Sequence, residues 1–156
     1  MTSAPPAATE RAFETARGVV YPWQMDHVGH MNVQFYTARF DEATWHFFAR
    51  FGITSRYMRE ARRGMAAVEQ HTRYLRELHA GDLIRVTSEL LEAKPKSVRF
   101  VHRMYNAVTG EEAASTELTG VHMDTDARRV VPFPDGIAAR LAAALGQGAP
   151  GPRAGA

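Results

Sequence analysis

The residues of this chain best suited to chemistry lie together in segment 23–32, which reads Trp-Gln-Met-Asp-His-Val-Gly-His-Met-Asn. It holds one carboxylate, Asp26, two imidazoles, and an asparagine, Asn32, that can cap a helix. A carboxylate just before a helix lies beside backbone N–H groups that have no partner in the helix and beside the positive end of its dipole. Such a place can stabilise a developing oxyanion, with Asp26 as base or nucleophile. Gly29 adds backbone freedom and lets a substrate approach closely.

The same segment has a purely structural interpretation. Asp26 can satisfy the loop, Asn32 can cap the helix, and His27 and His30 can be ordinary polar loop residues, so the spacing alone does not choose between the two. A metal site is disfavoured, because two histidines three residues apart in a loop lack an evident third and fourth ligand. We therefore expect no metal and no cofactor.

Two elements must position this segment. A strand over residues 14–21 precedes it, and a long helix over residues 33–51 follows it, with aromatic and small residues repeating every three or four positions on one face. Asn32 is a good N-cap, and Gly52 stands where a left-handed C-terminal residue belongs. The helix therefore needs another element of the fold that buries its apolar, aromatic face.

Four further strands, with turn sequences between them, are predicted after a basic helical connector over residues 54–63. They cover residues 66–76, 83–93, 97–107 and 111–123, and a last short helix begins at Asp135. This order predicts an α+β domain in which a five-stranded antiparallel sheet wraps around the one long helix.

The composition limits the classes of protein to which this chain can belong. With 156 residues, of which 45% are hydrophobic and 23% charged, the chain fits one domain over residues 12–145. The Ala-, Pro- and Gly-rich ends, 1–11 and 146–156, are expected to be disordered. The absence of cysteine excludes disulfides, thiolate metal sites and a cysteine nucleophile. A net charge of +2 without a nucleic-acid motif disfavours nucleic-acid binding, and the lack of a long apolar run disfavours a membrane span, so a cytoplasmic protein is expected.

The segment 26–32 resembles the DxxGHxN signature of the 4-hydroxybenzoyl-CoA-thioesterase-like branch of the hotdog-fold acyl-CoA thioesterases. Further motifs in the family's order are Phe35-Tyr36, Phe40-Asp41-Glu42-Ala43, Tyr74-Leu75-Arg76, Gly81-Asp82-Leu83-Ile84-Arg85-Val86, Lys96-Ser97-Val98-Arg99-Phe100 and Pro132-Phe133-Pro134. The resemblance covers residues 19–134, which is most of the expected domain.

The resemblance implies a hotdog fold and an acyl-CoA thioesterase whose active site lies between two subunits of a homodimer. It makes Asp26 the catalytic carboxylate and the backbone amides at the start of the helix the oxyanion hole. The other residues that it places in the catalytic site are Gly29, His30, Asn32 and Val33. Val33 stands where relatives commonly have a polar residue, which leaves open what assists Asp26, and Glu77 replaces a proline at a turn, a change expected to be structural.

The expected substrate-binding residues are Trp23, Tyr36, Glu69, Thr72, Lys96 and Arg99. Glu69 lies on the strand expected to line the cleft, although a solvated glutamate is the better-supported interpretation. Thr72 could orient a water. Lys96 and Arg99 could hold the CoA phosphates, because fixed cations suit that task.

Two other function classes stay open. A hotdog hydratase or dehydratase acting on enoyl thioesters could use Asp26 and His30 as base and acid. A non-catalytic acyl-CoA-binding module is the other possibility. The sequence selects neither the acyl group nor dimer over tetramer. His102, on an apolar strand face, is expected to be a core histidine with its hydrogen bonds satisfied.

Overall fold

The computed structural model describes residues 11–146, so the end segments expected to be disordered lie outside the described residues except at Arg11 and Gly146. In chain order the elements are β1 (Phe13–Val19), η1 (Pro22–Gln24), α1 (Val33–Arg50), α2 (Ser55–Ala61), β2 (Arg63–Tyr74), β3 (Leu83–Ala93), β4 (Ser97–Asn106), β5 (Glu112–Asp124), β6 (Arg129–Val130) and α3 (Asp135–Gly146).

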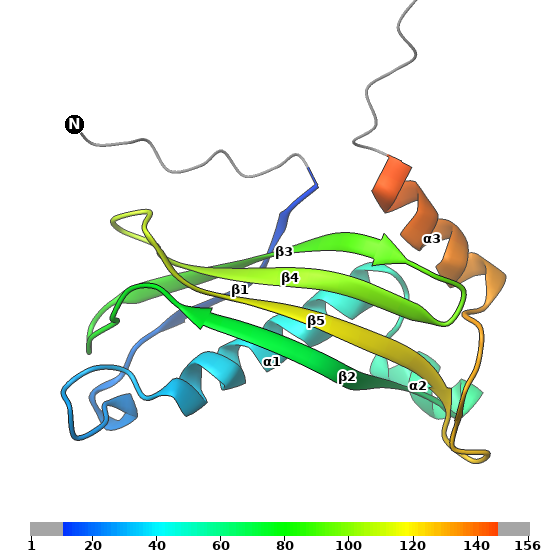
Figure 1. Ribbon diagram of the computed structural model, residues 1–156, viewed down its shortest axis with the longest axis horizontal. Helices are drawn as coiled ribbons and strands as arrows, with labels where there is room; N and C mark the ends of the chain where they lie inside the picture. The colour runs from blue at the N-terminus through cyan, green and yellow to red at the C-terminus, as the bar shows by residue number, and fades with distance from the viewer. Residues whose placement is uncertain (1–10, 147–156) are drawn as a thin grey trace, which may run out of the picture.

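The strands form one antiparallel sheet in the order β1-β3-β4-β5-β2, with β6 added beside β5. Figure 1 shows this sheet curving over α1, while α3 lies near the end of β3. The expected α+β architecture is confirmed, and the predicted strands are present with ends shifted by up to three residues. β6 was not predicted, since two residues carry no periodicity, and Gly146 ends α3 instead of starting a tail.

The aromatic stripe of α1 is buried as its spacing predicts. The helix residues that the sheet covers are Tyr36, Phe40, Ala43, Phe47 and Phe48. The ring of Phe47 stacks on Phe100 of β4 at 4.6 Å and on Phe13 of β1 at 6.0 Å, measured between centroids. These contacts fix α1 across both the edge strand β1 and the centre of the sheet.

A buried chain of hydrogen bonds also joins α1 to the sheet through His102. The hydroxyl of Thr44 donates to the carbonyl of Phe40 at 2.9 Å, so it accepts from His102 Nε2 at 2.9 Å. His102 Nδ1 is then the acceptor for Ser88 Oγ at 2.6 Å, and Ser88 lies 2.7 Å from Thr15 Oγ1. The expected satisfied core histidine is therefore present, with its proton on Nε2.

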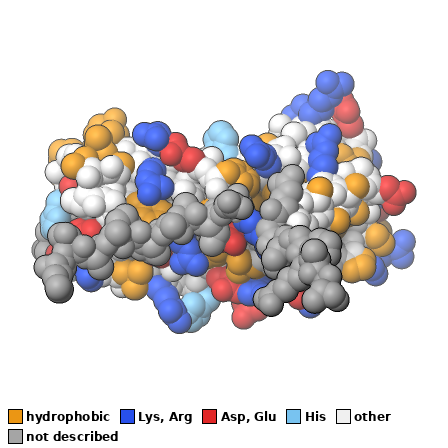
Figure 2. All heavy atoms as spheres, turned by 90° about the horizontal axis from the view of Figure 1, so that it is seen from above, with side chains coloured by type: hydrophobic (Ala, Val, Ile, Leu, Met, Phe, Trp, Pro, Cys, Tyr) orange, Lys and Arg blue, Asp and Glu red, His pale blue; other side chains and the backbone are white. Residues whose placement is uncertain are grey.

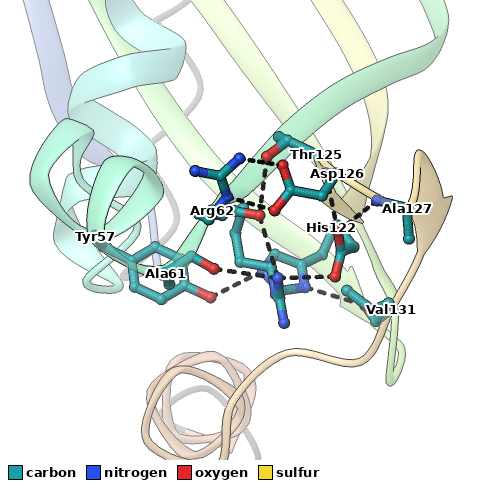
Figure 3. A network of polar contacts seen from close by, with 10 residues as sticks. Tyr57, Ala61, Arg62, His122, Thr125, Asp126, Ala127 and Val131 are labelled. Atoms are coloured by element: carbon teal, nitrogen blue, oxygen red, sulfur yellow. Dashed lines mark hydrogen bonds and ion pairs between the residues drawn. The ribbon is translucent and has the colours of Figure 1, made fainter.

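A second buried histidine ties α2 to the strands beyond it. His122 Nδ1 lies 3.0 Å from the Val131 carbonyl, which makes it the donor there, and Nε2 accepts from the Tyr57 hydroxyl at 2.9 Å. Figure 3 shows these contacts beside the ion pair of Arg62 with Asp126. The C-terminal end of α2 is thereby fixed to the β5–β6 turn.

The basic connector is largely paired within the chain. Arg63 lies 3.0 Å from Asp124, and Arg56 lies 2.8 Å from Glu60. Figure 2 shows Lys and Arg side chains intermixed with Asp and Glu over one face of the molecule. Both observations fit the small net charge better than a surface for nucleic acid.

Among the strands of residues 11–146, β2 forms one end of the sheet and pairs with β5 alone. It runs for twelve residues, and most residues from Ala67 to Tyr74 are exposed, with Val68 at 61% and Tyr74 at 49% exposure. A long exposed edge strand carries unpaired backbone donors and acceptors that favour pairing with another strand.

Burial lowers the pKa of His102 from 6.5 to about 3, so the folded chain holds this imidazole neutral. Below pH 6.5 the unfolded chain binds a proton that the folded chain does not, and stability falls as the pH falls. We expect His102 to account for a loss of about 2 kcal/mol in the free energy of unfolding between pH 7.5 and pH 5.

Urea unfolding of the wild type and of His102→Gln over this pH range measures the effect, because the carboxylates common to both proteins cancel in the difference. The variant is expected to show the flatter curve. Parallel curves would show that His102 takes up no proton on unfolding.

Candidate active site

The loop between β1 and α1 is folded around Gln24, which is buried. Its side-chain carbonyl accepts from the Tyr21 N–H at 2.8 Å, and its backbone carbonyl accepts from the Asn32 N–H at 2.9 Å. Met25 and Met31 form an isolated antiparallel bridge. The loop therefore closes as a short hairpin.

Asp26 opens the turn at the tip of this hairpin. Its Oδ1 accepts from the Val28 N–H at 3.0 Å, and its carbonyl accepts from the Gly29 N–H at 3.2 Å. Gly29 has a φ of 92°, in the left-handed region that favours glycine. Asp26 therefore has a structural role in this turn, which uses only its Oδ1. The other carboxylate oxygen, Oδ2, is turned toward His30.

The second oxygen of Asp26 lies in a partly shielded, polar setting. Asp26 Oδ2 is 3.9 Å from His30 Nδ1, and His30 Nε2 is 3.9 Å from Glu77 Oε1. Both separations are too long for hydrogen bonds. The Asp26 side chain is 14% exposed, so the carboxylate can meet a ligand while most of bulk water is kept away.

Helix α1 begins at Val33, seven residues after Asp26 in the sequence. Asn32 caps the helix, since its Oδ1 accepts from the Gln34 N–H at 3.0 Å. Val33 is the first helical residue and is 53% exposed. The N–H groups of a first turn lack partners within the helix, which makes this end suited to an anion.

The segment after β2 also contacts the loop between β1 and α1 and the first turns of α1. The Met31 N–H donates to the Leu78 carbonyl at 2.8 Å, and the Tyr36 hydroxyl donates to the Arg76 carbonyl at 3.3 Å. Burial, with a smaller contribution from the Glu77 carboxylate, raises the pKa of Tyr36 to about 12. The Tyr36 hydroxyl therefore stays protonated and keeps its donor role.

A cavity of about 250 Å³, here called the loop cavity, lies between this loop and the end of β2. The residues that line it include His30, Val33, Tyr36, Tyr74, Arg76 and Glu77. Three of the predicted site residues, His30, Val33 and Tyr36, thus share one cavity, and His30 lies 3.9 Å from the Asp26 carboxylate.

A second cavity of about 240 Å³, here called the helix cavity, lies between α1 and strands β2, β4 and β5. Its walls include the aromatic rings of Phe40, Phe48 and Phe100. Asp41 Oδ2, also at this cavity, accepts from the indole N–H of Trp45 at 3.3 Å. This cavity offers room for an apolar group farther along the helix.

Asp26, Gly29 and Asn32 are not among the residues that line the loop cavity, and neither are the predicted residues Trp23, Thr72 and Glu69. Trp23 is 69% exposed and stacks on Tyr21 at 6.0 Å. Thr72 is hydrogen-bonded to Thr116 at 2.8 Å. Glu69 is exposed on the edge strand, where its neighbour Gln70 lines the helix cavity, so alternation directs Glu69 to the other sheet face.

Lys96 and Arg99 lie at the opposite end of the sheet from Asp26. β1 meets β3 near Leu83, whereas the turn that carries Lys96 follows Ala93, a separation of roughly 33 Å along the strand. Arg99 is paired with Glu117. Within one chain, neither cation can reach a ligand that also contacts Asp26 through a short link.

Sequence reasoning missed Tyr74 and Glu77 as residues of this site. Tyr74 packs edge to face on Tyr36 with ring centroids 5.3 Å apart. The signal for Glu77 was available, because it stands where the family has proline. Its carboxylate lies 3.9 Å from His30, which ties this substitution to the predicted active site.

Within residues 11–146, no group of three or more His, Asp or Glu side chains is arranged to hold a metal ion. No helix in the described part of the chain is long and apolar enough to cross a membrane.

Comparison with known proteins decides the family. The profile of the Thioesterase-like superfamily matches residues 20–141. The chain belongs to this superfamily. A hypothetical protein from Staphylococcus aureus, in complex with CoA, has a similar fold, with a TM-score of 0.81, 22% identity, and coverage of 90% of this chain and 87% of that chain. The family resemblance and the hotdog architecture expected from the sequence are thus confirmed.

Two curated relatives of this superfamily member support thioester hydrolysis. The betainyl-CoA thioesterase of Pseudomonas aeruginosa is 28% identical over 80% of this chain and 78% of its own length. The L-carnitine dehydrogenase/betainyl-CoA thioesterase of Rhizobium meliloti is 30% identical over 75% of this chain. The match spans 23% of the length of that two-activity relative.

The role of Asn32 as the cap of α1 can be tested through the stability of the protein. Asn32→Ala is expected to lower the free energy of unfolding by about 1 kcal/mol, because the Gln34 N–H loses its acceptor. Asn32→Asp should keep most of the stability, since a carboxylate accepts the same bond and suits the helix dipole. Urea unfolding measures both, with Gln34→Ala as the control on the same turn. An equal loss in Asn32→Ala and Asn32→Asp would contradict the capping role.

Proposed function

We propose that this superfamily member is an acyl-CoA thioesterase in which Asp26 carries the reaction. The observation that supports this most directly is the setting of Asp26: its carboxylate is 14% exposed and lies 3.9 Å from His30, which lines a cavity of about 250 Å³ together with Val33, the first residue of α1. The curated relatives act, by their names, on the CoA thioester of betaine, so short acyl groups belong in any substrate panel.

Two routes from Asp26 give the same products. In the first, Oδ2 attacks the thioester carbon, the C–S bond breaks, CoA leaves as the thiolate, and water hydrolyses the resulting mixed anhydride. In the second, Asp26 takes a proton from a water that attacks the carbon, and the tetrahedral intermediate then expels the CoA thiolate. Both routes place negative charge on the former carbonyl oxygen, and in this proposal the Val33 N–H and the helix dipole stabilise that charge.

Replacing Asp26 tests this role. Asp26→Asn keeps a side-chain oxygen for the Val28 N–H but removes the base, so we expect kcat to fall by about 10²- to 10⁴-fold. Release of free CoA, followed with a thiol reagent, measures hydrolysis and separates it from hydration of an enoyl group. His27→Asn, an exposed change in the same turn, is the matched control and should hydrolyse like the wild type. Wild-type turnover by a folded Asp26→Asn protein would contradict the proposal.

We further propose a homodimer that forms through β2. A two-fold axis perpendicular to the sheet pairs the two β2 edges antiparallel, which sets the Tyr74 end of one strand against the Arg63 end of the other. The loop cavity, which Tyr74 lines, would then face the partner's opposite end. The exposed backbone edge and Val68 supply the contact.

The same pairing offers a place for the coenzyme. Lys96 of the partner subunit and Arg99 of the partner subunit would lie about three strand spacings, roughly 14 Å, from β2 of the first chain and at the Asp26 end of that chain. The pantetheine arm of CoA can cover such a gap, which explains how cations far from Asp26 within one chain could hold the phosphates. We propose a cytoplasmic location, where CoA thioesters are available.

The dimer is tested by sedimentation velocity at micromolar concentration, with one species of twice the chain mass expected. Val68→Arg adds a charge to the exposed β2 edge and should shift the protein toward monomer with loss of activity. Val108→Arg, at an exposed site on the β4–β5 turn, is the control and should leave the dimer intact. A stable monomer with full activity would overturn this assembly.

A further inference from the structure

The loop cavity differs in chemistry from the helix cavity. It combines two aromatic rings, those of Tyr36 and Tyr74, whose centroids are 5.3 Å apart at an interplanar angle of 85°. The Glu77 carboxylate lies at the same cavity, and its side chain is 65% exposed in the single chain. Aromatic rings beside a carboxylate are the groups that recognise a positively charged centre without hydrogen-bond donors.

Two carboxylates flank the position where an acyl group would meet the catalytic loop. Glu77 Oε1 is 3.9 Å from His30 Nε2, and Asp26 Oδ2 is 3.9 Å from His30 Nδ1, so a single imidazole ring separates them. His79 Nε2 approaches Glu77 from the other side at 3.6 Å. When both imidazoles are neutral, this group of side chains is negative overall.

The one arginine among the lining residues does not cancel that charge. The Arg76 guanidinium donates to the Leu75 carbonyl at 2.9 Å and lies 3.9 Å from Glu111. It is thus occupied by acceptors of its own, while its backbone carbonyl accepts from the Tyr36 hydroxyl. Glu77 remains the carboxylate available to a ligand in the loop cavity.

We propose that Glu77, with the rings of Tyr36 and Tyr74, is the specificity-determining group for a cationic acyl substrate, with a quaternary ammonium as the fitting chemistry. This rests on the proposed thioesterase function and names the substrate class of the same site. In a short cationic acyl group the positive centre lies two bonds from the thioester carbon. Only a subsite next to Val33 and Asp26 can hold it while the carbonyl is attacked.

The helix cavity is too far along α1 to serve such a group. Its carboxylate, Asp41, is eight residues from Val33, about 12 Å along the helix axis. Asp41 also accepts from the Trp45 indole. The helix cavity therefore suits a long apolar acyl chain, and the two cavities make opposite predictions for substrate preference.

A pair of substrates of the same shape tests the role of Glu77. Betainyl-CoA and tert-butylacetyl-CoA differ only in whether the branched centre is a charged nitrogen or a neutral carbon. The wild type is expected to have the higher kcat/KM with betainyl-CoA. In Glu77→Gln, the betainyl-to-tert-butylacetyl ratio of kcat/KM should fall by about 5- to 20-fold, an effect set by a partly exposed charge.

Matched variants separate the effect of the Glu77 charge from a general loss of folding or activity. Glu77→Asp keeps the carboxylate and should retain most of the ratio. Glu14→Gln removes an exposed carboxylate on β1, at the other edge of the sheet from β2, and it should leave the ratio unchanged. Tyr74→Phe keeps the ring and the preference, whereas Tyr74→Leu should reduce it.

Each outcome has a definite consequence. An unchanged ratio in Glu77→Gln, or a wild type that prefers tert-butylacetyl-CoA or octanoyl-CoA, overturns the cationic subsite while the thioesterase proposal stands. Failure of the wild type to release CoA from any thioester in the panel overturns the proposed function and the subsite with it.

Discussion

The burial of one aromatic stripe of α1 is the constraint on which this structure depends. A single helix with Phe40, Phe47 and Phe48 on one side needs an apolar surface that curves around it, and the antiparallel sheet supplies that surface with one face. Because the rings lock α1 in place, the first turn of the helix keeps a fixed position relative to the hairpin that carries Asp26. Packing far from the site thus sets the geometry of the site.

The elements of this fold could be read from the sequence because each follows from a local pattern. The stripe over α1, the Asn32 cap and the alternation of β3 and β4 all require only nearest neighbours along the chain. Strand ends were less well placed, since they depend on pairing. β2 begins earlier than its apolar pattern, at Arg63, where the side chain is held by Asp124 of the adjacent strand.

The residues of the site also divide into those that a local pattern predicts and those that only the fold brings together. Asp26 and His30 belong to one short motif, and the turn that brings them to 3.9 Å is local. Glu77 and Tyr74 lie more than forty residues away, and their approach to that motif depends on the exit of β2 and on the backbone bond from Met31 to Leu78. No periodicity encodes such a contact. The unusual residue after Tyr74-Leu75-Arg76 was the only local indication.

The hydrogen-bonded chain through His102 has a consequence for the response to salt. Its members are two threonines, a serine and a neutral imidazole, all fully partnered within the protein. Mobile ions screen exposed pairs such as Arg56 with Glu60, but they have little effect on buried neutral dipoles. The register of α1 on the sheet is therefore independent of ionic strength, and the site should keep its shape across conditions that loosen the surface around it.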